Sequence, residues 1–220
     1  MFHKIISRKD FADLVKDDMT IMIGGFMACG TPETLIDVIL EKGVKNLTII
    51  SNDTGFVDKG LGRLVAAKQV SRVIVSHIGT NPETGKQMVE GTLKVDLVPQ
   101  GTLVERIRCA GAGLGGVLTP IGVGTMVEEG KQKITVEGID YLLELPLRAE
   151  LALIGGSIVD KAGNVVYNAT TRNFNPIMAM AADTVVVEAS KLVEIGEIQA
   201  ELVMTPAPLI DHIFVPEKSR

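Results

Sequence analysis

The chain has 220 residues, of which 46% are hydrophobic, and its formal net charge is −5. That length suits one sizeable α/β domain and is short for two, so we expect a single domain over residues 1–220. The acidic balance excludes nucleic acid and an anionic membrane as main partners, because both require a basic face.

The first part of the chain predicts a helix, a strand, a glycine loop and a second helix. Ser7 followed by Asp10 is typical of a helix N-terminus. Residues 20–23 form a short apolar run that stops at two glycines, a pattern typical of a buried strand. We expect the next helix to begin at Thr31 and Pro32, as its N-cap and its first helical residue.

The same alternation continues further along the chain. The expected strands are residues 47–50, 72–75 and 95–98, and the expected helices are residues 61–70 and 102–108. Strands that alternate with helices in this way favour a mainly parallel sheet flanked by helices, which is an α/β fold.

The alternation stops at a glycine-rich stretch. Residues 111–125 contain six glycines and one proline, so we expect a long ordered loop, a feature that is usually functional in a compact domain. The remaining expected elements are a hairpin of strands 151–159 and 165–167 around a turn at 160–164, a helix at 176–182 and a strand at 185–187.

Nothing in the sequence indicates a membrane segment, a secretion signal or a metal site. No uninterrupted apolar run reaches the roughly 18 residues of a membrane span, and no signal-peptide pattern occurs. Cys29 and Cys109 share no short-spaced motif, so we expect free thiols. The three histidines are scattered without metal-ligand spacing. We therefore expect a soluble, cytoplasmic protein without a bound metal.

A glycine cluster between an expected strand and an expected helix is the first candidate binding site. Glycine lets backbone N–H groups approach a ligand closely, and a helix N-terminus adds about half a positive charge. Such a loop could hold a pyrophosphate, a thioester oxygen or a carboxylate, although the same residues also suit an ordinary tight turn. The candidate residues are Gly24, Gly25, Phe26, Met27, Ala28, Cys29 and Gly30.

Two alternatives within the glycine clusters concern other chemistries. Cys29 could act as a nucleophile near a helix N-terminus, but a small packing residue is the commoner role. Residues 111–116 formally contain G-x-G-x-x-G. A dinucleotide site requires that motif to follow a strand and open a helix, whereas here it follows an expected helix, so we exclude NAD binding.

Two uncharged amides, Asn52 and Gln100, lie where expected strands end. This is the edge at which open α/β sheets bind ligands. An amide can donate a hydrogen bond to a developing oxyanion without competing as a nucleophile. Turn capping by Asn52 and helix capping by Gln100 are the structural alternatives, and position alone leaves both open.

Residues 17–32 resemble the signature of family I CoA-transferase A (α) subunits. That signature is an acidic residue, an apolar run, G-G-F, three residues and then G-x-P. Further segments resemble the same family in the same order, namely residues 51–55, 77–82, 98–103, 111–113 and 172–176. The resemblance extends from about residue 5 to about residue 212, and within the family it is greatest to A subunits of acetate/butyrate–acetoacetate CoA-transferases.

The resemblance implies a divided enzyme whose substrate is CoA and which holds no permanent cofactor. In the family, a glutamate of the partner β subunit attacks the acyl-CoA thioester and then carries the CoA as a glutamyl thioester. The family's Glu-Asn-Gly motif does not occur in this sequence, so we expect the nucleophile on the partner. The family also implies an α₂β₂ assembly and a fold similar to that of sugar-phosphate isomerases.

The resemblance also assigns roles to the candidate residues. Asn52 would help to stabilise the oxyanion, and Gln100 would help to orient the partner's glutamate. Residues 24–30 would form part of the wall of the CoA site.

Two rival hypotheses come from other functional classes. A sugar-phosphate isomerase or ligand-sensing domain of similar fold would need a general base beside the glycine loop, and Asp53 is the obvious candidate. Alternatively, the chain could be a non-catalytic subunit that only shapes and stabilises its partner.

Overall fold

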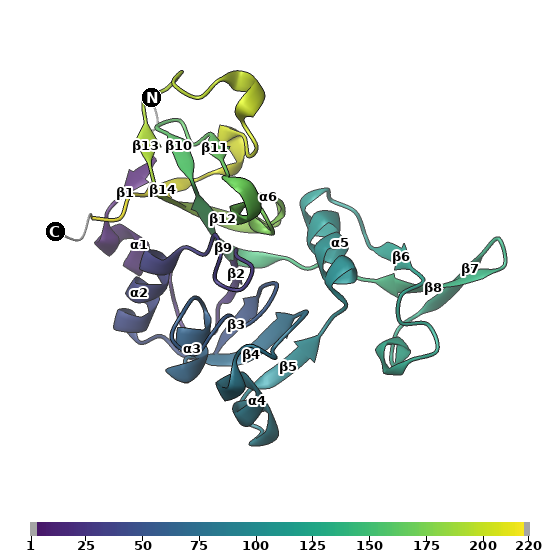
Figure 1. Cartoon of the computed structure of the whole chain (residues 1–220). Helices are drawn as coiled ribbons and strands as arrows, with labels where there is room; N and C mark the ends of the chain where they lie inside the picture. Colours follow the sequence, from purple (N-terminus) through teal and green to yellow (C-terminus); the bar gives the residue numbers. More distant parts are fainter. Residues whose placement is uncertain (1–3, 218–220) are drawn as a thin grey trace.

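Eight strands form the central sheet of the computed structural model, which describes residues 4–217 (Figure 1). The sheet order is β1-β14-β12-β9-β2-β3-β4-β5, and every neighbouring pair is parallel. This confirms the predicted α/β fold. In chain order the strands are β1 (Ile5–Ile6), β2 (Thr20–Ile23), β3 (Leu47–Ile50), β4 (Val70–Val75), β5 (Lys94–Leu97), β9 (Ala149–Gly156), β12 (Ala182–Ala189) and β14 (His212–Phe214).

Helices cover both faces of this sheet, as the two hydrophobic clusters show. One cluster joins Ile21 and Ile23 of β2 to α1 and α2, whereas Met22 faces the second cluster together with α5 and α6. Alternate strand residues therefore face opposite cores, as the two-residue period of a strand requires. The helices are α1 (Arg8–Leu14), α2 (Glu33–Lys42), α3 (Gly62–Ala66), α4 (Pro82–Val89), α5 (Gln100–Gly111) and α6 (Asn175–Met178).

The first helix begins as predicted, but the second does not. The Ser7 hydroxyl accepts from the Asp10 backbone N–H at 3.1 Å, and the Ser7 backbone N–H donates to the Asp10 carboxylate at 3.0 Å. These two hydrogen bonds form a capping box. The second helix begins at Glu33, with Pro32 and not Thr31 as its N-cap. The Thr31 hydroxyl instead lies directly over Gly25, where an added Cβ would come within 2.0 Å of it.

Two other predicted helices are too long. The helix expected at 61–70 ends at Ala66, because Lys68 adopts a positive φ of 54° and the Gln69 N–H bonds back to Leu64 O, closing the helix end. The helix expected at 176–182 ends at Met178, and Ala182 already belongs to β12. In both places the chain turns early to reach the next buried strand.

The strand expected at 151–159 is in fact two strands in different sheets. β9 ends at Gly156, and β10 (Ile158–Asp160) pairs with β11 (Val165–Val166) and β13 (Leu192–Val193) in a small sheet. The predicted turn at 160–164 does join an antiparallel pair, so the hairpin prediction is correct for β10 and β11. Helix α4 was not predicted, although Asn81 caps it and Pro82 opens it.

The glycine-rich stretch is only partly a loop. Its residues Val117–Thr119 form β6, which pairs antiparallel with β8 (Ile139–Glu144), and β8 pairs with β7 (Lys133–Val136). Figure 1 shows this three-stranded sheet extending away from the central sheet. Sequence analysis missed it because β6 is only three residues long and its partner lies more than 20 residues later.

Short 3₁₀ turns complete the described elements, at Met126–Glu128, Ala169–Thr171, Ala200–Leu202 and Ala207–Leu209. Within residues 4–217, no helix has both the length and the apolar character that a membrane span requires.

Candidate functional site

The carboxyl ends of β2, β3, β4 and β5 meet at one edge of the sheet, and the candidate residues lie there. Asn52 follows β3, Ser76 follows β4, and Gln100 follows β5 as the first residue of α5. The structure brings the two predicted amides into direct contact, since Gln100 Nε2 donates to Asn52 Oδ1 at 2.6 Å. Residues 48 positions apart in sequence thus form one polar pair at the edge where parallel sheets bind ligands.

The Asn52 amide is surrounded by partners from its own chain. Its Oδ1 also accepts from the Ser76 hydroxyl at 3.1 Å, and its Nδ2 donates to the Asp53 carboxylate at 2.6 Å. Asn52 is only 1% exposed, whereas Gln100 is exposed. In this chain the accessible amide is therefore that of Gln100, with Asn52 directly behind it.

The glycine loop contains a strained two-residue turn. Phe26 and Cys29 bond to each other through both backbone N–H groups, at 3.0 and 2.9 Å. Between them, Met27 and Ala28 have φ values of 47° and 62°, the conformation of a type I′ turn that normally selects Asn and Gly. A left-handed non-glycine residue costs roughly 1–2 kcal/mol, and such strain is concentrated at functional sites.

Contacts from two other segments hold this loop in place. The Met27 N–H donates to the Asp53 carboxylate at 2.8 Å, and the Gly25 N–H donates to Asn173 Oδ1 at 3.1 Å. Asn175 Nδ2 donates to Gly30 O at 3.0 Å. The resembling segments 17–32 and 172–176 therefore lie against each other.

The packing also explains why the loop begins with glycine. A Cβ at position 24 would lie 1.8 Å from Asn175 Oδ1, so even alanine does not fit there.

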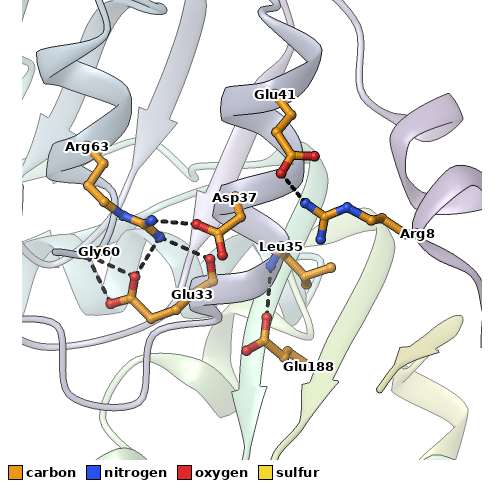
Figure 2. Close-up of polar contacts among 8 residues, drawn as sticks. All are labelled: Arg8, Glu33, Leu35, Asp37, Glu41, Gly60, Arg63 and Glu188. Carbon is orange, nitrogen blue, oxygen red and sulfur yellow. Dashed lines mark hydrogen bonds and ion pairs between the residues drawn. The ribbon is translucent and has the colours of Figure 1, made fainter. Parts of the chain in front are cut away.

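The N-terminus of α2 is already occupied by a carboxylate of this chain. Glu188 of β12 accepts from the Leu35 N–H at 2.8 Å (Figure 2). Burial raises the pKa of Glu188 to about 7, although its hydrogen bonds to Leu35 and Thr34 oppose that shift. The partial positive charge of this helix therefore acts mainly on Glu188, which weakens the prediction that the helix N-terminus strengthens anion binding in the glycine loop.

A second polar network lies beside the loop that follows β3. Glu33 accepts from the Gly60 N–H at 3.0 and 3.2 Å, and Arg63 donates to Glu33 and Asp37 at 2.7 and 2.5 Å (Figure 2). This network joins the start of α2 to the start of α3. The loops after β2 and β3 are thus fixed side by side.

The cysteines form no disulfide with each other. Both cysteines are free; Cys29 is exposed, with Sγ 3.4 Å from the Thr170 hydroxyl, and Cys109 is buried. Among residues 4–217, no group of three or more His, Cys, Asp or Glu side chains is placed to hold a metal ion.

Sequence reasoning missed several residues that shape the site. In the sequence Asn173 and Asn175 stand out only as part of a resembling segment, and Asp53 only as part of another such segment and as a base for the rival isomerase hypothesis. Ser76 gave no signal beyond its position after a strand. Their contacts depend on which strands are neighbours in the sheet.

Comparison with known sequences gives matches over nearly the whole chain. Residues 6–215 match the protein-family model for coenzyme A transferase. The chain is 55% identical over 217 residues to the acetate CoA-transferase subunit alpha of Escherichia coli K12, which covers 99% of both chains. It is 56% identical over 213 residues to the acetoacetyl-CoA:acetate/butyrate CoA transferase alpha subunit of Clostridium acetobutylicum, covering 97% of this chain and 98% of that protein.

Solved structures with the same fold are more distant in sequence. An acyl-CoA transferase from Escherichia coli O157:H7, solved as a thioester complex with CoA, aligns with a TM-score of 0.86 and 20% identity. The alignment covers 99% of this chain but only 48% of that transferase, so this chain spans about half its length. Glutaconate coenzyme A-transferase from Acidaminococcus fermentans aligns with a TM-score of 0.83 and 17% identity, over 96% of this chain and 75% of that one. These likenesses establish the α/β fold.

Proposed function

The chain belongs to the coenzyme A transferase family as an α subunit, and from this premise we propose its substrates and its mode of action. It moves CoA between an acyl-CoA, such as acetoacetyl-CoA, and a short-chain acid, acetate or butyrate. These are the substrates in the names of the two α subunits to which it is 55% and 56% identical. It acts only together with a β subunit.

One observation of the site supports the divided-enzyme proposal: within residues 4–217, the carboxylate next to the two amides is enclosed by donors of this chain. Gln100 is exposed and bonded to Asn52. The adjacent carboxylate, Asp53, is 4% exposed and accepts from Met27 N, Asn52 Nδ2 and Gly55 N. A nucleophile must reach the thioester carbonyl, and the enclosed Asp53 is not placed to do so, which supports the partner glutamate that the family resemblance implies.

The reaction then follows the family's covalent course. The partner's glutamate attacks the thioester carbonyl, forming an acyl-glutamyl anhydride and releasing CoA thiolate. The thiolate attacks the glutamyl carbonyl, which forms a glutamyl-CoA thioester and releases the first acid. The second acid repeats these steps in reverse and leaves as the new acyl-CoA, with the glutamate regenerated. Water must be excluded, since both intermediates hydrolyse.

The residues of this chain support those steps. Gln100 orients the partner's glutamate, and Asn52, which is buried behind it, contributes to stabilising the oxyanion through Gln100. The loop from Gly24 to Gly30 (Gly24, Gly25, Phe26, Met27, Ala28, Cys29 and Gly30) forms part of the wall of the CoA site. CoA is a substrate, and no permanently bound cofactor is required.

The assembly proposed is an α₂β₂ tetramer in the cytoplasm, with residues 1–220 as one domain of the α subunit. The named α subunits among the relatives support a β partner. The β subunit would also supply part of the acyl pocket. Acetate and butyrate differ by two methylenes, and each methylene contributes only ~1–3 kcal/mol to discrimination.

The decisive experiment is co-expression with a β subunit and an assay of acetoacetyl-CoA consumption with acetate, for each chain alone and for the mixture. Activity only in the mixture supports the divided enzyme. Substantial activity from this chain alone would contradict it. Unchanged turnover in both Asn52→Ala and Gln100→Ala complexes would favour the purely structural subunit.

The isomerase alternative has no support in the site. Its required base, Asp53, is enclosed and fully engaged by backbone and amide donors. Thermal stabilisation of the complex by CoA esters, and not by sugar phosphates, is the expected result.

A further inference from the structure

We propose that Asp53 is a positioning residue that sets the hydrogen-bond direction of both site amides, an inference that rests on the function proposed above. Asp53 lies directly after Asn52 and contacts Asn52 but not Gln100. It therefore acts on the reaction through its neighbours. Its contacts form a chain from a buried carboxylate, through a buried amide, to an exposed amide.

The direction of this chain follows from hydrogen-bond chemistry. Both Asp53 oxygens accept from backbone N–H groups, so the Asn52 atom 2.6 Å from Oδ2 is the NH₂ group that donates to it. Asn52 Oδ1 is then turned toward Gln100, which donates to it at 2.6 Å, and toward the Ser76 hydroxyl, which lies 3.1 Å from it and 2.8 Å from Asn52 O. Gln100 must in turn present its NH₂ group to Asn52.

The Gln100 amide is thereby held in one orientation. One hydrogen of its Nε2 is used by Asn52, while its second N–H and its Oε1 have no hydrogen-bond partner among residues 4–217. That N–H is the donor available to the partner's carboxylate. If Asn52 rotated by half a turn, it would present its own NH₂ group to Gln100, and the Gln100 amide would have to rotate as well.

Asp53 itself cannot rotate freely, because both of its oxygens are engaged. Oδ1 accepts from the Gly55 N–H at 2.7 Å, and Oδ2 accepts from the Met27 N–H at 2.8 Å in addition to Asn52. Asp53 also forms an isolated parallel bridge with His77, and it is 4% exposed. A fixed acceptor of this kind determines which end of a neighbouring amide faces it, and so the direction of the hydrogen bonds beyond that amide.

The same carboxylate joins the two parts of the proposed site. Through Met27 it holds the strained turn of the glycine loop, and through Asn52 it directs Gln100. Asp53 therefore positions both the proposed wall of the CoA site and the amide that faces the partner's glutamate.

The test is Asp53→Asn in the complex of this chain with its β subunit. Asparagine has the same shape but only one accepting oxygen, so it cannot accept on both sides. Either the Gly55 N–H loses its partner, or Met27 and Asn52 lose theirs. We expect kcat to fall roughly 100-fold, as for a small misplacement of a catalytic group, with a smaller change in KM for the acyl-CoA.

Asp160→Asn is the matched control. Asp160 is 2% exposed and accepts from three backbone N–H groups and the Asn164 side chain, but it lies in the hairpin of β10 and β11. The two substitutions are chemically identical and equally buried. Asp160→Asn should lower Tm at least as much as Asp53→Asn and leave kcat unchanged.

A double-mutant cycle separates positioning from general damage. Because Asp53 acts largely through Gln100, Asp53→Asn should cost only about 10-fold or less in a Gln100→Ala background, where the direction of the Asn52 amide no longer acts on Gln100 and only the contacts of Asp53 with the two loops still matter. An equal fall in kcat in both backgrounds would overturn the proposal. A wild-type mixture without transferase activity would instead refute the proposed function, and this inference with it.

Ser76→Ala provides an independent test if Asp53→Asn does not fold. It removes the hydroxyl that lies 3.1 Å from Asn52 Oδ1 and 2.8 Å from Asn52 O, while the Ser76 N–H still bonds to Asn52 O at 2.8 Å. We expect a kcat reduction of several-fold that disappears in the Gln100→Ala background. A reduction that persists there, or an unchanged kcat, counts against the proposed chain of contacts.

Discussion

The loops after β2 and β3 share a sequence pattern but not a backbone conformation. Residues 25–30 and 55–60 both read G-F-x-x-x-G, and both close with a two-residue turn between the phenylalanine and the residue before the last glycine. In the first loop the central residues, Met27 and Ala28, have positive φ values, whereas neither residue 57 nor residue 58 does. The same pattern thus produces a strained turn in one place and a relaxed turn in the other.

The difference comes from what each loop contacts. In the first loop the Met27 N–H reaches across to Asp53 of the next loop, at 2.8 Å. In the second loop it is Gly60, outside the turn, that donates to Glu33. A hydrogen bond from within the turn to a buried carboxylate selects the strained conformation. Strain therefore lies where the site is proposed, and buried partners maintain it.

Asn175→Ala removes side-chain support from the first loop, and we expect it to have the largest effect on the free energy of unfolding. Asn175 is 0% exposed and bonds to Gly30 O, Thr171 O and Gly155 N at 3.0, 2.8 and 3.0 Å. Each buried group left unpaired costs about 1–3 kcal/mol, so we expect the free energy of unfolding to fall by at least about 3 kcal/mol. Denaturant titration measures it.

Arg63→Ala is the corresponding change beside the second loop. Arg63 is 23% exposed, and its partners Glu33 and Asp37 are 39% and 42% exposed. Solvent screens such ion pairs, so Arg63→Ala should lower the free energy of unfolding by about 1 kcal/mol. Equal losses in the two variants would refute the view that the first loop depends more strongly on buried partners.

Adding a methyl group to the first glycine of each pattern sharpens the comparison. A Cβ at Gly25, where φ is 127°, would lie 2.0 Å from the Thr31 hydroxyl, and one at Gly55, where φ is 60°, would lie 2.8 Å from Lys59 O. We expect Gly25→Ala to cost about 3 kcal/mol and Gly55→Ala about 2 kcal/mol in unfolding free energy.

Gly43→Ala controls for backbone strain alone. Gly43 ends α2 with φ of 72°, and a Cβ there would contact nothing within 4 Å. The expected cost is about 1 kcal/mol. A cost as large as that of Gly25→Ala would show that crowding by Thr31 contributes nothing.

The buried carboxylate at α2 should make stability depend on pH. The folded-state pKa of Glu188 is raised to about 7, from 4.5, chiefly by burial. Between these values the folded state binds the proton more tightly, so Glu188 favours folding at low pH, and this contribution is lost as pH rises through about 7. Relative to the Glu188→Gln variant, the free energy of unfolding of the wild type should fall by about 2–3 kcal/mol between pH 4.5 and pH 8.

Denaturant titrations of both proteins across this range measure the effect. The Arg63 network beside the second loop should instead give a salt-dependent contribution, because its ion pairs are partly exposed to solvent. A constant difference between wild type and Glu188→Gln would contradict the assignment.

The smallest expected effects on the free energy of unfolding come from two substitutions to glycine, one in each turn, and they should have opposite signs. Ala28→Gly removes the strain of a φ of 62° and should stabilise the protein by about 0.5 kcal/mol. Asp58→Gly relieves no such strain and should destabilise it by about 0.5–1 kcal/mol, through the greater freedom of the unfolded chain. Changes of the same sign would indicate that the two turns do not differ in strain.

Much of this architecture could be predicted from local patterns. Buried strands were recognised at 20–23 and 47–50 because apolar runs end at glycine or turn residues, and the capping box at Ser7 fixed the start of α1. The small sheet of β6, β7 and β8 could not be recognised in the same way. β6 lies among glycines, and it is a strand only because residues more than 20 positions later pair with it.

For the site, the sequence by itself determined position along the chain: Asn52 and Gln100 follow strands of one parallel sheet, so they had to emerge at the same edge. The tertiary structure decided which atoms meet. The strand order β3-β4-β5 brings Gln100 Nε2 to Asn52 Oδ1 and leaves Asn52 buried behind it. The left-handed turn at Met27 and the central place of Asp53 are also tertiary results. Local periodicity fixes where a residue leaves a strand, whereas a hydrogen bond requires two distant segments to approach within about 3 Å.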